Sequence, residues 1–264
     1  MRILGSKFLI PIAAIICGVL FWFRPGSIEG PRAPAVMPTG KGFDHRLWGE
    51  VLKAVVDEHG QVDYGALRDS PDALDRYLGM IRAASPASAP HRFRSINDRL
   101  AYYLNAYNAF VLAAIRDICP LDSISDAYLA NGFFWRVSFL MGEEEMTLSD
   151  LESERIRGVM QKNPIVHFAL VKGARGFAPL SREPFEADGL DAQLDALARR
   201  IAQGTNMVKR DDDVLVLNQM FQWYQNDFVD VETWLKRYAP TMVEGHRRIA
   251  YQPFDWRLNG RCAP

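Results

Sequence analysis

A histidine lies within a short apolar stretch near the middle of the chain. His167 interrupts residues 165–171, which read IVHFALV between Pro164 and Gly173. A short apolar run bounded in this way predicts a buried strand. Because an imidazole titrates near neutral pH, His167 at the polar end of such a strand can act as a general acid or base. The alternative is a core histidine whose ring nitrogens are hydrogen-bonded inside the protein.

Two cations and two glycines follow this run directly. Gly173 and Gly176 let the backbone approach a ligand closely or present N–H groups to an anion, although a tight turn explains them equally well. Lys172 and Arg175 lie beside these glycines, and we expect both cations to be ligand-binding residues.

A pair of amides lies in the string LNAYNAF, residues 104–110. Asn105 and Asn108 are three residues apart, so they share one face of a helix, with Tyr107 beside them on its apolar stripe. Amides in a core-forming helix need partners: they tie the helix to a loop, or they orient a catalytic histidine. We predict a catalytic set of His167, Asn105 and Asn108, with Tyr107 and Trp135 binding the ligand.

Other polar residues have simpler explanations. Ser149 and Glu152 have the spacing of a capping box, so helix initiation accounts for Glu152 without chemistry. Arg155 and Arg157 fit exposed helix charges better than an anion site. The sequence has no Walker loop, G-x-G-x-x-G, H-E-x-x-H, G-x-S-x-G or C-x-x-C motif. We therefore expect no metal and no cofactor, and nucleotide-binding and zinc-protease functions lose support.

Hydrophobic periodicity predicts the elements that must position these residues. The expected helices are 43–60, 70–81, 95–118, one that begins near 149, 190–204, 220–228 and one that ends at 238. The expected strands are 133–140, 145–148, 165–171, 208, 214–217 and 249–256. Few strands, joined by hairpins with helices between them, favour an α+β class. We expect a predominantly helical single domain with a small, mainly antiparallel sheet.

The first residues form an apolar targeting segment. Residues 8–23 carry no charge and are flanked by Lys7 and Arg24. We predict a membrane anchor or signal segment at 1–24, a linker at 25–42 rich in Pro and Gly, and a globular domain at 43–264. The favoured interpretation is a single-pass inner-membrane protein whose domain lies in the periplasm. The alternative is a secreted or periplasmic protein after cleavage near Ala35.

Composition excludes some partners. The 264 residues include 31 basic and 32 acidic side chains, a net charge of −1. No overall field attracts nucleic acid, so we expect no nucleic-acid partner. Three cysteines are too few for a disulfide framework, and a bridge between Cys119 and Cys262 is one open possibility.

Six strings of the sequence together form a recognisable pattern. They are VDYGAL at 62–67, LNAYNAF at 104–110, TLSDLE at 147–152, VHFALVKGARGFAPL at 166–180, FQWYQNDF at 221–228 and IAYQPFDWRLN at 249–259. These strings resemble a family of bacteria and plants, the domain of unknown function 547. The resemblance covers about residues 44–259 and implies one domain, but the family has no settled activity.

One departure from the family bears on chemistry. The family's pattern has cysteines at the positions held here by Lys172 and Phe177, and those thiols would suit thiolate chemistry. A nucleophilic or redox function that needs these sulfurs cannot operate in this chain.

Two functions follow from these residues. The first is an envelope-anchored binding or scaffold module, with a groove lined by Tyr107, Trp135, His167 and the two asparagines that holds a peptide, glycan or small ligand. The second is a hydrolase or transferase-like enzyme that uses His167 as acid or base without a cysteine nucleophile. Because the family's cysteines are absent, we rank binding first.

Overall fold

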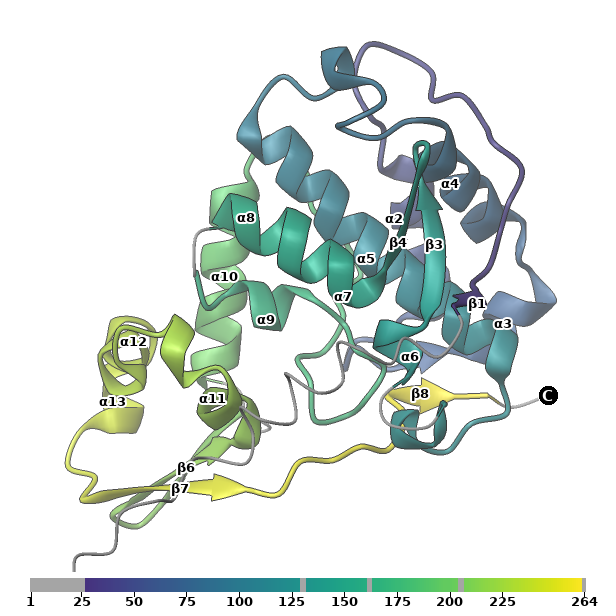
Figure 1. Cartoon of the computed structure of the whole chain (residues 1–264). Coiled ribbons are helices and arrows are strands. Elements are labelled where there is room, and N and C mark those ends of the chain that lie inside the picture. The colour runs from purple at the N-terminus through teal and green to yellow at the C-terminus, as the bar shows by residue number, and fades with distance from the viewer. Residues whose placement is uncertain (1–26, 129–131, 161–162, 204–206, 263–264) are drawn as a thin grey trace, which may run out of the picture.

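Helix α5, Ile96–Ile118, is the central element of the computed structural model, which describes residues 27–128, 132–160, 163–203 and 207–262 (Figure 1). A capping box starts the helix, since Asp98 N–H donates to Ser95 Oγ at 3.0 Å and Ser95 N–H to Asp98 Oδ2 at 2.7 Å. Every residue from Leu100 to Arg116 is buried. A helix buried on all sides is a core helix, so the helix expected at 95–118 is confirmed and forms part of the core.

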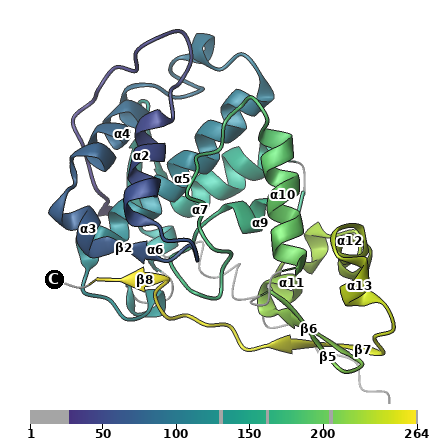
Figure 2. The ribbon, with the colours of Figure 1, turned by 180° about the vertical axis from the view of Figure 1, so that it is seen from behind.

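The other helices surround α5 in two groups. Helices α2, α3 and α4 pack on one side of α5 (Figures 1 and 2). Helices α10 to α13 lie on the other side, together with strands β5 (Val208–Asp211), β6 (Val214–Asn218) and β7 (Arg248–Gln252). Their bounds are α2 Arg46–Val55, α3 Tyr64–Asp69, α4 Asp72–Ala83, α6 Gly132–Trp135, α7 Leu148–Asp150, α8 Arg157–Met160, α9 Val166–Ala169, α10 Leu190–Gln203, α11 Gln219–Trp223, α12 Val231–Tyr238 and α13 Pro240–Val243. The expected helices near 43–60, 70–81 and 190–204 are thereby confirmed. Helices α2 and α10 are shorter than expected, and α4 is shifted by two residues toward the C-terminus.

The strands form three small sheets in the described residues. They are β1 (Ile28–Glu29), β2 (Val62–Asp63), β3 (Val137–Met141), β4 (Glu144–Thr147), β5 (Val208–Asp211), β6 (Val214–Asn218), β7 (Arg248–Gln252) and β8 (Gly260–Arg261). Hairpins β3–β4 and β5–β6 are antiparallel, as predicted, whereas β1–β3, β2–β8 and β6–β7 are parallel. The α+β class is confirmed, but the single, mainly antiparallel sheet is wrong, because segments distant in sequence add parallel strands to the hairpins.

The strand predicted at 165–171 is instead the short helix α9. Asn163 Oδ1 accepts from Ile165 N–H, and His167 N–H donates to Pro164 O at 3.2 Å, which closes a helical turn. All seven residues are buried. A short run that is apolar throughout looks the same for a buried strand and a buried helix, so periodicity could not separate them.

Two further strand predictions are too long. Residues 133–135 belong to α6, and β3 starts only at Val137. The closing strand ends at Gln252, since beyond it the chain leaves β6 and runs to other partners.

The C-terminal segment 253–262 crosses the molecule to reach α5 (Figure 1). Its backbone bonds two loops: Gly176 N–H donates to Asp255 O, and Ile124 N–H to Trp256 O. Strand β8 then pairs with β2, and a disulfide joins Cys262 to Cys119 at the end of α5. The bridge that the sequence left open is therefore present.

The described part of the expected linker lies against the domain. Strand β1 pairs with β3, Ala33 is buried, and Val36 N–H donates to Gly79 O. The expected anchor, 1–24, lies outside the described residues. Among the helices that the structure describes, none has both the length and the apolar character to cross a membrane.

Candidate functional site

A π-helix carries the first charged residue of the site. Element η4, Leu151–Ile156, continues α7 and leads into α8. The capping box that starts α7 uses Thr147 and Asp150, not the predicted Ser149 and Glu152. Glu152 is therefore not needed for helix initiation. A π-turn inside a helix is rare and is found frequently at functional sites.

Glu152 forms a buried ion pair with Lys172. Lys172 Nζ lies 2.7 Å from Glu152 Oε2 and 3.3 Å from the hydroxyl of Tyr224. Burial by itself raises the pKa of Glu152, but the charge and hydrogen bond of Lys172, together with the neighbouring ring of His167, outweigh it and lower this pKa to about 2. Burial opposes the charge of Lys172 too, yet Glu152 raises the pKa of Lys172 above its ordinary value. Both residues are thus charged near neutral pH.

His167 lies next to this ion pair and is completely buried. Its Nε2 lies 2.7 Å from Asp227 Oδ2, and its ring stacks on Tyr224 with 3.6 Å between centroids. Nδ1 is 3.6 Å from Glu152 Oε1, beyond ordinary hydrogen-bond length. Arg157 holds the other side of Asp227, at 2.9 Å from Oδ1. Burial raises the pKa of Asp227, but His167 and Arg157 outweigh this effect and lower it below its ordinary value.

An open hollow of about 600 Å³ lies over the ion pair. Its floor contains Glu152, Lys172 and Arg157, and Trp135 and Trp223 are exposed aromatic residues of its wall, 63% and 41% exposed. We call this the aromatic hollow. Its ring side chains are Phe134, Trp135, Phe177, Trp223, Tyr224 and Trp256. The Lys172 ammonium lies 5.7–6.0 Å from the ring centroids of Phe134, Phe177 and Tyr224, within the range of cation–π attraction.

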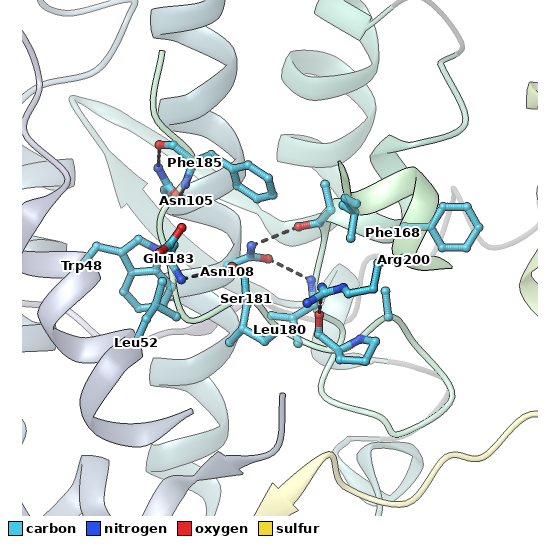
Figure 3. Close-up of a pocket in the computed structure, with 15 residues that line it drawn as sticks. Trp48, Leu52, Asn105, Asn108, Phe168, Leu180, Ser181, Glu183, Phe185 and Arg200 are labelled. Atoms are coloured by element: carbon cyan, nitrogen blue, oxygen red, sulfur yellow. Dashed lines mark hydrogen bonds between the residues drawn. The ribbon is translucent and has the colours of Figure 1, made fainter. Parts of the chain in front are cut away.

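The two asparagines hold backbone groups (Figure 3). Asn105 donates to Phe185 O at 2.7 Å and accepts from Phe185 N–H. Asn108 donates to Ala169 O at 3.1 Å and accepts from Val171 N–H. Both line an enclosed space of about 20 Å³, which is room for one water. Within the described ranges neither is hydrogen-bonded to the ring of His167, and the interpretation in which these amides tie the helix to a loop fits them.

The predicted ligand-binding residues are divided. Trp135 and Lys172 line the aromatic hollow, whereas Arg175 donates Nε–H to Leu258 O and lines a different hollow. Tyr107 is fully buried near Lys172, and its hydroxyl has no hydrogen-bond partner among the residues described.

The glycine loop after α9 is a tight, packed turn. Gly173 has a φ of +76°, and a Cβ there would lie 2.5 Å from Ile115 Cδ1 of α5. The N–H groups of Arg175 and Gly176 donate to Arg257 O and Asp255 O. These two groups are therefore not available to an anion.

Sequence reasoning missed four residues of the site, Glu152, Arg157, Tyr224 and Asp227. Glu152 was assigned to a capping box with Ser149, although Thr147 and Asp150 have the same spacing two residues earlier. Tyr224 and Asp227 lie in FQWYQNDF, where the aromatic stripe gave the stronger signal. No local pattern shows that residues 152, 167, 172, 224 and 227 meet.

Fold and site together define an α+β domain in which a buried ion-pair network lies beneath an aromatic hollow. Residues 92–200 match the model of the family described as "Protein of unknown function, DUF547", and this match supports the resemblance that the sequence strings indicate. The match includes Glu152, His167 and Lys172, and it ends before Tyr224 and Asp227. Comparison with curated proteins and with solved structures gave no match.

Proposed function

We propose that the chain is a binding module and that the aromatic hollow takes an uncharged glycan. The observation that carries this proposal is the exposure of Trp135 and Trp223 at the wall of a hollow of about 600 Å³. An apolar, largely aromatic lining with a few convergent polar groups is typical of small-ligand sites. Flat indole faces can cover the C–H face of a sugar ring, and the edge of each indole remains a hydrogen-bond donor.

The charges of the floor favour a neutral ligand over a charged one. Lys172 is paired with Glu152, and Arg157 with Asp227. Each cation at the floor is therefore already neutralised by a carboxylate, and a charged peptide would find no unmatched charge there. Aromatic faces are left as the main recognition surface.

The same proposal places the domain in the envelope, held to the inner membrane by residues 8–23. The Cys119–Cys262 disulfide supports this location, because disulfides form and persist in oxidising compartments such as the periplasm. Cleavage near Ala35 would instead give a periplasmic protein that lacks β1.

Acid–base catalysis by His167 is the less favoured function. Its imidazole is fully buried, Tyr224 covers one ring face, and Asp227 holds Nε2. A general acid or base must come within hydrogen-bond reach of the substrate proton, and this ring does not line the aromatic hollow.

Calorimetric titration of the full chain in neutral micelles tests the binding function. We expect saturable binding of N-acetylglucosamine oligomers, and Trp135→Ala and Trp223→Ala should each weaken it about tenfold, since stacked aromatic groups dominate binding energy. Tyr251→Ala is the matched control, because Tyr251 is an exposed aromatic residue on β7 outside the hollow. Binding of neutral peptides without binding of any glycan would overturn the assignment.

A further inference from the structure

A second hollow, of about 770 Å³, opens beside the glycine loop. It lies between α10, β5, the loop that contains Gly176 and the C-terminal segment at Asp255. Neighbouring residues separate the two hollows, since Gly176 lines this one and Phe177 lines the aromatic hollow. The binding function proposed above does not use it.

Three cations line this second hollow from three separate elements. Arg175 comes from the glycine loop, Arg200 from α10 and Lys209 from β5. In the part of the chain that the structure describes, none of them has a carboxylate within 4.0 Å. These cations differ in this respect from Lys172 and Arg157 at the floor of the aromatic hollow, which are both paired.

Two carboxylates also line this hollow. Asp255 binds Arg257 through both oxygens, at 2.9 Å and 2.6 Å, and the charge of Arg175 acts on it as well. Glu58 is exposed and lies 3.6 Å from the ring of His59, beyond ordinary hydrogen-bond length. Because three cations face these two carboxylates, and Asp255 is shared with Arg257, the hollow keeps an excess of positive charge.

Backbone carbonyls hold both guanidinium groups in place. Arg175 Nε–H donates to Leu258 O at 3.0 Å, and Arg200 Nη2–H donates to Pro179 O at 3.0 Å. A guanidinium has five N–H donors, so each group keeps most of its donors for a ligand. Arg200 is exposed as a whole residue, yet the protein around it desolvates its charge enough to lower its pKa. An anion would compensate that cost.

We infer that the second hollow binds the phosphate group of a phosphate monoester. Such a group carries about 1.5 to 2 negative charges near pH 7, which suits three cations that line one hollow better than the single charge of a carboxylate. The guanidinium fork pairs with two phosphate oxygens at once, and the Lys209 ammonium supplies a further point charge. A soluble phosphate ester and the headgroup of phosphatidic acid present the same chemistry.

Calorimetric titration with inorganic phosphate tests this site, with the full chain in phosphatidylcholine nanodiscs. We expect saturable binding that weakens as salt is added, and Arg200→Gln should weaken it about tenfold, as the loss of charge-assisted hydrogen bonds implies. Lys209→Gln should weaken it as well, and it disturbs no side-chain hydrogen bond among the residues described. Arg199→Gln is the matched control, because Arg199 is the preceding residue of α10 and is paired with Asp195.

Three results would overturn the inference: no saturable phosphate binding, equal loss in Arg199→Gln and Arg200→Gln, or acetate binding as tightly as phosphate. Discs that contain phosphatidic acid distinguish the two sources. If the headgroup occupies the hollow, these discs reduce the apparent affinity for inorganic phosphate, and Arg200→Gln removes that reduction. If the natural ligand is soluble, phosphatidic acid has no effect while inorganic phosphate still binds. Glycan affinity at the aromatic hollow is a separate readout that neither result changes.

Discussion

At the scale of single residues, the ion pair of Glu152 and Lys172 replaces the chemistry expected from the family. Lys172 lies where the resemblance led us to expect a cysteine, and a carboxylate 2.7 Å away holds it in the charged state. An ammonium kept protonated is a poor nucleophile, so Lys172 does not substitute for a thiolate. Its charge instead ties Glu152 of the π-helix to the segment that leads into the glycine loop, and both residues line the floor of the aromatic hollow. This pair is a structural feature with a measurable dependence on pH.

We predict that Glu152 makes the fold less stable in acid. Its pKa falls from an ordinary 4.5 to about 2 in the folded chain, so the unfolded chain binds this proton more readily. The stabilisation is therefore complete above about pH 4.5 and is lost as the pH falls toward 2. Denaturant unfolding at a series of pH values should show this decline, and Glu152→Gln should flatten it. Asp227 keeps its own lowered pKa in the variant, so a smaller slope remains. A variant curve parallel to that of the wild-type chain would contradict the assignment.

At the scale of elements, local signals predicted the helices better than the site. The Ser95–Asp98 box and the apolar stripe of α5 lie within one segment, so the sequence alone locates this helix. The run at 165–171 has no such signal, because it is apolar almost throughout and therefore shows neither the period of a helix nor that of a strand. The start of α7 has two overlapping signals, Thr147 with Asp150 and Ser149 with Glu152, and the structure uses the first.

That choice between caps is testable. Thr147→Ala should lower the free energy of unfolding by about 1 kcal/mol, because it removes the side-chain oxygen that accepts from Asp150 N–H. Ser149→Ala should change it by less than about 0.5 kcal/mol, since Ser149 is not the cap of α7. Chemical denaturation of both variants at neutral pH measures the difference. If Ser149→Ala lowered the free energy of unfolding more than Thr147→Ala, Ser149 would be the cap, as the sequence indicated.

At the scale of the whole molecule, the site depends on chain segments that are far apart in sequence. Glu152, Lys172 and Tyr224 come from three segments, and the wall of the aromatic hollow adds Trp256 from the C-terminal segment. No single window of sequence contains this information, which is why the charged network could not be predicted. The C-terminal segment that supplies Trp256 is held by backbone bonds to two loops and then by the Cys119–Cys262 disulfide.

We predict that this disulfide stabilises both the domain and the aromatic hollow. It joins residues 143 positions apart, and such a long closed loop places its expected contribution within the range of about 2–5 kcal/mol known for native bridges. Thermal unfolding of the full chain should shift to lower temperature in Cys119→Ser, and a reductant should shift the wild-type chain equally while leaving this variant unchanged. Cys17→Ser, which removes the third cysteine, should behave as the wild-type chain does.

Because Trp256 lies on the tethered segment, loss of the bridge should also weaken glycan binding. If the reductant changed neither the unfolding temperature nor the glycan affinity of the wild-type chain, the segment would stay in place without the bridge and the prediction would be wrong.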